Sequence, residues 1–198
     1  MSSPVPRRNR AVILVIALLS FVPFALAWYL TRHPELLGAT SNYGHLVTPA
    51  RPLDFAELTA RPLNPAAAPA ELKGRWVLLQ VAAGPCRERC AETLHKTRQV
   101  RLMTNKEIPR IRRLLLVPEG APAGDYAAQL EADPTLAAAG ASPPLLASLT
   151  EALGRPPDDG TVLLLDPLAN LVLWYDPGFD PYGLLKDLKH LLRASQIG

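Results

Sequence analysis

Hydrophobic and polar positions divide this chain into three parts. Ala11 to Leu30 is an apolar run without a charged residue, whereas residues 31–70 are rich in proline and show little sustained periodicity. Residues 71–198 alternate between short apolar runs and segments with helical spacing. Short apolar runs bounded by turn residues are typical of buried strands, and spacings of three and four residues indicate helices. The pattern predicts a long apolar helix, a tether and one folded domain.

The apolar run predicts a single-pass membrane anchor. It is twenty residues long and ends at the interfacial aromatics Trp28 and Tyr29, and that length spans a bilayer. Three basic residues precede it: Arg7, Arg8 and Arg10. Because basic flanks stay on the cytoplasmic side, we expect residues 1–10 in the cytoplasm and 11–30 in the membrane. In a bacterium this is the inner membrane, with the C-terminal domain in the periplasm.

A cleaved signal peptide is the alternative for this segment. Ala25-Leu26-Ala27 resembles a processing site that follows a short apolar region. Both alternatives export the rest of the chain. We interpret residues 31–70 as a Pro-rich tether and place the start of the folded domain near Glu71.

The first half of the domain predicts a βαβ unit. Trp76 to Val81 is an apolar strand that Gly84-Pro85 ends, Ala91 to Lys106 has a helical composition, and Arg112 to Val117 is a second apolar strand. Strands joined by a helix of this length are parallel, with a right-handed crossover. Three apolar residues of the helix are expected to be buried: Leu94, Leu102 and Met103.

The second half predicts a hairpin and a closing helix. After an excursion over residues 119–154, with helices expected at 125–131 and 144–153, strands at 161–165 and 171–175 flank a short polar turn. Asp180-Pro181 then begins a helix with leucines on one face. The order βαβ, excursion, ββα predicts an α/β thioredoxin-like fold, with the N-terminal transmembrane helix added.

Cys86 and Cys90, the only cysteines in the chain, fall where the first strand gives way to the helix. Backbone N–H groups at a helix start stabilise a thiolate and lower the pKa of a cysteine. A static disulfide is the alternative, although a bridge over so short a loop constrains little of the unfolded chain. A fully helical spacing would hold the two side chains too far apart for a disulfide, so bridging requires a loop or a distorted turn at Cys86.

Basic residues are concentrated in the segment that follows Cys86. The 198-residue chain is 48% hydrophobic with a formal charge of +3, which is not an extreme balance. Residues 87–113 nevertheless hold nine basic side chains against three acidic ones. This run is either a solvated helix face or a field that favours thiolates or docks an acidic partner. We expect no nucleic-acid partner, because the basic run would lie outside the cytoplasm and no groove-binding motif accompanies it.

The spacing Leu72-x-Gly74-x-Trp76-Val77-Leu78-Leu79, then Cys86-x-x-x-Cys90, then Leu163-Leu164-Leu165-Asp166-Pro167 resembles the SCO/SenC group of membrane-anchored, thioredoxin-like proteins. The resemblance covers residues 72–192. It implies a role in cytochrome c oxidase assembly, either by binding copper through the CxxxC thiolates and a distant histidine or by acting on thiols of an oxidase subunit. Cys86 and Cys90 match the thiols.

The histidine of that group has no counterpart here, because this chain reads Pro156-Pro157-Asp158-Asp159-Gly160 at its position. Four histidines remain as ligand candidates: His33, His45, His95 and His190. Cu(I) suits thiolates, so Cys86 and Cys90 are candidate copper ligands whose third donor is unknown.

We therefore expect a membrane-anchored protein that acts on thiols or Cu(I) during respiratory complex assembly. Cys86 would be the attacking thiol, with Arg87 and Arg89 lowering its pKa, and Cys90 would resolve the mixed disulfide. The alternative function is a tethered interaction module with a structural disulfide. Such a module would bind oxidase subunits or other assembly factors through its basic face.

Overall fold

The computed structural model describes residues 7–33, 42–195 and 197 in two units, one up to Ser41 and one from Asn42 onward. The first unit is the helix α1, Arg7–Arg32. Its segment Ala11–Arg32 has a mean hydropathy of 2.6 and is long and apolar enough to cross a membrane. Large side chains such as Phe21 and Phe24 are exposed along it, which suits a lipid environment. The predicted apolar helix is therefore present.

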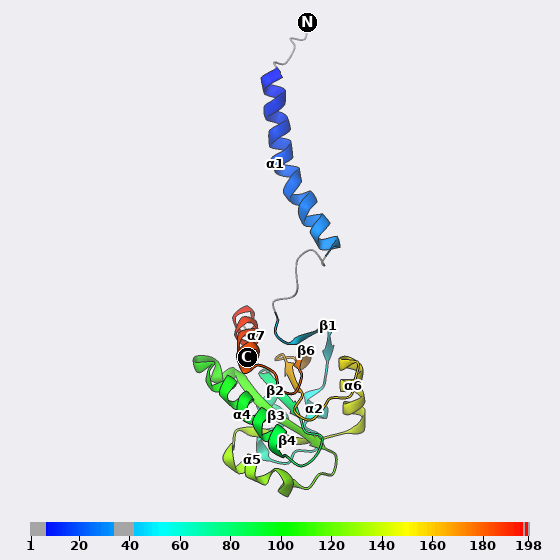
Figure 1. Ribbon diagram of the computed structural model, residues 1–198, viewed down its shortest axis with the longest axis vertical. Coiled ribbons are helices and arrows are strands. Elements are labelled where there is room, and N and C mark those ends of the chain that lie inside the picture. The colour runs from blue at the N-terminus through cyan, green and yellow to red at the C-terminus, as the bar shows by residue number, and fades with distance from the viewer. Residues whose placement is uncertain (1–6, 34–41, 196, 198) are drawn as a thin grey trace. The chain divides into compact units, whose positions relative to one another are not determined.

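The second unit is built on a six-stranded sheet with the order β1-β6-β5-β2-β3-β4 (Figure 1). Strands β2, β3 and β4 are parallel, whereas β5 pairs antiparallel with β2 and β6, and β1 pairs antiparallel with β6. The strand bounds are β1 His45–Pro52, β2 Trp76–Val81, β3 Ile111–Pro118, β4 Leu136–Ala141, β5 Val162–Leu165 and β6 Asn170–Tyr175. The predicted parallel βαβ unit and the antiparallel hairpin are both confirmed.

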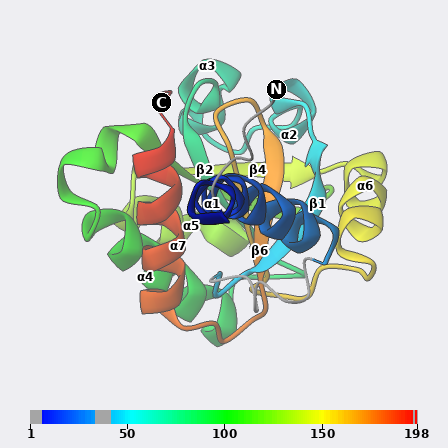
Figure 2. The ribbon, with the colours of Figure 1, turned by 90° about the horizontal axis from the view of Figure 1, so that it is seen from above.

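Helices cover both faces of this sheet, because alternate strand residues point to opposite sides. Val77 and Leu79 pack toward three helices: α2 (Phe55–Leu58), α3 (Pro69–Leu72) and α6 (Pro143–Leu153). Trp76 and Leu78, on the other face, pack toward α4 (Glu88–Leu102) and α7 (Pro181–Ala194). Figure 2 shows α4 and α7 on one side of the sheet and α6 on the other. A smaller cluster below the amino-terminal half of α4 includes α5 (Ala127–Ala132) and buries Cys90.

Two helix starts follow the sequence closely. Asp180 accepts hydrogen bonds from the backbone of Tyr182 and Gly183, and Ser142 accepts one from Leu145. Each of these caps is followed by a proline in the first turn, where its missing N–H is no loss. The helices predicted at 144–153 and after Asp180 are therefore confirmed.

The prediction that residues 31–70 form a tether is wrong for residues 42–70. The compact unit begins at Asn42, and β1 pairs with β6 at the edge of the sheet. Only Val47 of β1 is buried, so the strand lacks the alternation of apolar residues that would have revealed it. An edge strand also tolerates the prolines that indicated a linker. Residues 34–41 of the expected tether lie outside the described residues.

Two other expectations need correction. The strand β4 lies within the predicted excursion; its sequence is mostly alanine, which has low strand propensity, yet all six residues are buried between the two helical layers. The helix α4 ends at Leu102, earlier than expected, and a short 3₁₀ segment follows from Asn105 to Arg110. Leu102 and Met103, expected to be buried, are exposed because they lie at the helix end, whereas Leu94 is buried as predicted.

Candidate functional site

The two cysteines lie at the carboxyl end of β2, and a disulfide joins them. Cys86 lies in the loop just before α4, while Cys90 is the third residue of the helix. A disulfide over this short spacing requires Cys86 to lie outside the regular helix, and the structure places it there. Cys86 is half-buried and Cys90 is fully buried, so a reacting molecule reaches the pair from the side of Cys86.

Hydrogen bonds from three directions hold the loop that carries Cys86. The Tyr126 hydroxyl donates to the Gly84 carbonyl at 2.9 Å, and the Ala83 N–H donates to the Asp159 carboxylate at 3.1 Å. Gln129 donates to the Cys86 carbonyl at 3.5 Å. Burial, and then the charges of Asp125 and Asp159, raise the pKa of Tyr126, which therefore remains a neutral donor. The loop is fixed without a ligand.

Gln80 is a residue of this site that the sequence reasoning missed. It lies near the end of β2, is 1% exposed, and donates from Nε2 to the carbonyl oxygen of Cys90 at 3.1 Å and to its Sγ atom at 3.6 Å. The available signal was one polar residue in an otherwise apolar strand. Such a residue is buried only with a specific partner.

The basic run, interpreted above as either a solvated helix face or a field around the cysteines, is divided in the structure. Arg87 and Arg89 are exposed beside the pair. Most of the others have partners elsewhere; for example, Lys96 lies 2.7 Å from Glu92, and Arg101 donates to the Ile111 carbonyl. A local effect of Arg87 and Arg89 on the thiols stays a prediction, while a broad basic field over the whole run is weakened by these pairings.

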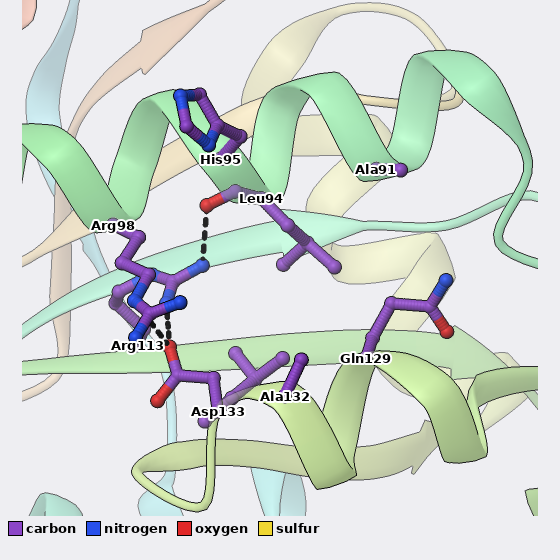
Figure 3. A pocket seen from close by; sticks show the side chains of 9 residues that line it. Ala91, Leu94, His95, Arg98, Arg113, Gln129, Ala132 and Asp133 are labelled. Atoms are coloured by element: carbon purple, nitrogen blue, oxygen red, sulfur yellow. Dashed lines mark hydrogen bonds and ion pairs between the residues drawn. The ribbon is translucent and has the colours of Figure 1, made fainter.

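Arg113 is the most deeply buried of these basic residues. Figure 3 shows it under α4 in a groove between α4 and α5, directed at Asp133. Its nitrogens donate to the Asp133 carboxylate at 2.5 Å, the Leu94 carbonyl at 2.7 Å and the Thr97 hydroxyl at 3.2 Å. Burial lowers the pKa of Arg113 to about 10, with Asp133 opposing, so the guanidinium stays charged at neutral pH. This cluster ties α4 to β3.

The candidate histidines do not complete a metal site with the cysteines among the described residues. His95 is exposed at the rim of the groove in Figure 3, His190 is exposed on α7, and His45 stacks on Trp174 and bonds Asp176. His33 lies in the first unit. Within the described residues there is no group of three or more His, Cys, Asp or Glu side chains that could hold a metal ion.

The segment that aligns with the missing histidine does lie near the cysteine loop. Gly160 donates to the Val81 carbonyl at 2.9 Å, and a Cβ atom at Gly160 would come within 3.5 Å of Arg89. The neighbouring side chain is the Asp159 carboxylate, a hard oxygen donor that already accepts the Ala83 N–H. Cu(I) prefers soft or imidazole donors. A copper centre with two thiolates and a histidine therefore does not fit these residues.

Two solved structures illustrate what this chain is similar to. The structure of Arabidopsis thaliana ScoI with copper bound is similar, with a TM-score of 0.50 and 17% identity over 64% of this chain and 89% of that one. A SCO1/SenC family lipoprotein from Bacillus anthracis matches with a TM-score of 0.49 and 12% identity, over 62% of this chain and 84% of that one. No curated protein sequence matches.

Residues 76–195 match the family described as "Transmembrane-like, thioredoxin-like, C-terminal domain". The match begins with β2, includes both cysteines and extends past the end of α7. It covers more than half of the chain and joins a thioredoxin-like domain to a transmembrane character, which is the combination that the two units display. The chain therefore belongs to this family of transmembrane-like proteins with a thioredoxin-like C-terminal domain.

Proposed function

We propose that this protein is a membrane-anchored thiol–disulfide exchange protein that acts on thiols during assembly of cytochrome c oxidase. The observation that carries the proposal is the asymmetry of the cysteine pair: Cys86 is half-buried in a loop, and Cys90 is fully buried in the first turn of α4. Exchange needs one accessible sulfur to be attacked and one sheltered sulfur to leave or return. The link to the oxidase rests on the SCO/SenC-like sequence pattern and fold.

The exchange step requires only the pair itself. A partner thiolate attacks the Cys86 sulfur, a new intermolecular disulfide forms, and the Cys86–Cys90 bond breaks with its electron pair on Cys90. A second thiol of the partner then releases Cys86, so that the partner is oxidised and the domain is reduced. In the reverse direction the Cys86 thiolate attacks a partner disulfide, and Cys90 resolves the mixed disulfide. Arg87 and Arg89 favour the thiolate of Cys86 electrostatically.

The location follows from the same proposal. The basic residues ahead of α1 would keep the N-terminus in the cytoplasm, which places the thioredoxin-like domain in the periplasm of a bacterial cell. An oxidising compartment is where a disulfide persists at rest. The partners would then be the exported domains of oxidase subunits or of other assembly factors.

The reduced cysteines could also bind copper. Reduced Cys86 and Cys90 would offer Cu(I) two soft thiolates, and ScoI structures have been determined with copper bound. Because a third donor does not fit at Asp159, we propose thiol exchange as the main activity and weak Cu(I) binding at most.

Trapping experiments test the proposal. Cys90→Ser should accumulate mixed disulfides between Cys86 and a partner, because the resolving sulfur is gone. The matched control, Cys86→Ser, should trap none, because the buried Cys90 is inaccessible. If neither variant traps a partner and oxidase assembly is unchanged in the double variant, the exchange function is wrong and the tethered interaction module replaces it.

A further inference from the structure

Gln80 is the one polar residue of β2 that faces α4, and it is nearly inaccessible to solvent at 1% exposure. On the same face of the strand, Trp76 and Leu78 pack into the apolar core. A leucine at position 80 would continue that core without a polar group to satisfy. Burying a carboxamide there without full hydrogen bonding is unfavourable, so the residue needs a local reason.

The contacts of Gln80 lie on Cys90. Its Nε2 group donates to the Cys90 carbonyl at 3.1 Å and to the Cys90 sulfur at 3.6 Å. A carbonyl oxygen only accepts hydrogen bonds, so the nitrogen rather than the oxygen of the amide faces Cys90. The Oε1 atom is buried and has no hydrogen-bond partner within the described residues. The amide is thus directed at the cysteine at the expense of its own acceptor.

We propose that Gln80 is a positioning residue for thiol exchange, stabilising the Cys90 thiolate through its Nε2–H group; this rests on the exchange function proposed above. When a thiolate attacks Cys86, the electron pair of the broken bond collects on a sulfur that is fully buried. Bulk water cannot solvate that charge. Hydrogen bonds to a charged acceptor are about twice as strong as neutral ones, so the contact with Gln80 strengthens as the disulfide opens.

A neutral amide has a specific advantage in this place. A carboxylate would repel the thiolate, and an alkyl side chain would leave it without a donor. An amide donates a hydrogen bond at every pH and neither takes up nor releases a proton. The leaving ability of Cys90 should therefore depend on its own pKa and not on the ionisation of the residue beneath it.

The test compares Gln80→Met with wild type, using dithiothreitol as the attacking dithiol on the full chain in detergent. Met keeps the length of the side chain and lacks the donor. Loss of a charge-assisted hydrogen bond predicts disulfide reduction that is about tenfold slower or more. In a Cys86→Ala background, where Cys90 is the one remaining thiol, the ultraviolet absorbance of the thiolate should report a pKa raised by about one unit or more relative to Cys86→Ala alone.

Two further variants separate a specific effect from a general disturbance. Gln80→Glu keeps the shape of the side chain, and its ionised carboxylate only accepts hydrogen bonds, so it should also slow reduction wherever the carboxyl is ionised. Gln129→Met is the matched control, because Gln129 also has a buried acceptor without a partner but contacts the Cys86 carbonyl and not a sulfur. It should leave the pKa of Cys90 unchanged.

Equal reduction rates and equal Cys90 pKa values in wild type, Gln80→Met and Gln80→Glu would overturn the role of Gln80 and leave thiol exchange intact. A wild-type disulfide that dithiothreitol cannot reduce would instead overturn the exchange function itself. A pKa shift in Gln129→Met as large as that in Gln80→Met would also count against Gln80, because the effect would then be a general response to loosening the loop.

Discussion

Two buried polar clusters contact α4, and they differ in how completely their hydrogen bonds are satisfied. Under the middle of the helix, three nitrogens of Arg113 donate to Asp133, Leu94 and Thr97. Under the first turn, Gln80 donates to Cys90 but its own oxygen lacks a partner in the described part of the chain. One cluster is a closed network, and the other lies against a bond that can be broken.

We interpret the Arg113 cluster as structural and the contact of Gln80 with Cys90 as functional. A closed network rigidifies its surroundings and has nothing left to offer a reaction. Gln80 instead directs a donor at a disulfide sulfur, and that hydrogen bond strengthens when negative charge develops on the sulfur. We therefore expect substitutions in the Arg113 cluster to change stability, and substitutions at the cysteine cluster to change reactivity.

The largest difference should come from removing the disulfide. Cys86→Ser combined with Cys90→Ser should abolish thiol exchange completely. Its free energy of unfolding should fall by only about 2 kcal/mol, because the chain-entropy contribution of so short a loop is small. Exchange assays and urea denaturation check the two halves. A stability loss much beyond this value would instead identify the bridge as a structural staple.

Arg113→Met should have the opposite profile. It leaves the Asp133 carboxylate with only the half-exposed Arg98, 3.8 Å away, as a cation, which costs about 3 kcal/mol. The reduction potential of the cysteine pair should stay near its wild-type value. Denaturant unfolding and thiol-trapping titrations check both expectations. Arg113→Met with Asp133→Leu is the control and should recover most of the stability. If Arg113→Met shifted the reduction potential of the cysteine pair, the two clusters would not act independently.

A substitution at Asp159 tests whether the cysteine site lacks only a third donor for Cu(I). Asp159→His would place an imidazole next to the cysteine loop, since Asp159 accepts the Ala83 N–H. The reduced variant should bind Cu(I) at least about tenfold more tightly than wild type, because the imidazole would supply the third donor. Competition against a Cu(I) chelator measures it. Tight Cu(I) binding by wild type, with a nitrogen donor in its X-ray absorption spectrum, would contradict our proposal that wild type binds copper only weakly.

The smallest effect should be a dependence of stability on acid pH. Burial opposes ionisation of Asp133, but hydrogen bonds from Thr135 and the charge of Arg113 outweigh it and lower the pKa of this carboxyl. A depressed pKa contributes stability above the unfolded value of about 3.9 and loses it as pH falls through the folded value. Asp133→Asn should therefore flatten the decline in stability below about pH 4, as measured by denaturation across pH.

The sequence predicted the elements whose pattern reports burial directly. The apolar run of β2, the hairpin of β5 and β6 and the leucine face of α7 all appear near their expected residues. It failed for β4, which is buried on both faces yet built mainly of alanine, and for β1, whose exposed edge position removes the apolar pattern. Tertiary pairing, not local propensity, makes these two segments strands.

The site was predictable in part for a similar reason. Cys86 and Cys90 are close in sequence, so their place at a strand-to-helix junction could be derived. Gln80 was visible only as a polar interruption, and its contact with Cys90 depends on how α4 packs over β2. The partner of Arg113 lies twenty residues away in sequence, and no periodicity links the two.

The reduction potential of the Cys86–Cys90 pair distinguishes an exchanging disulfide from a structural one. The full chain would be equilibrated in glutathione and dithiothreitol buffers of known potential, and its free thiols would then be trapped. Structural disulfides in exported proteins have potentials below about −300 mV, while exchanging ones lie higher. We predict a value above that limit. A pair that stays oxidised below it would contradict the exchange function and leave the disulfide as a structural link.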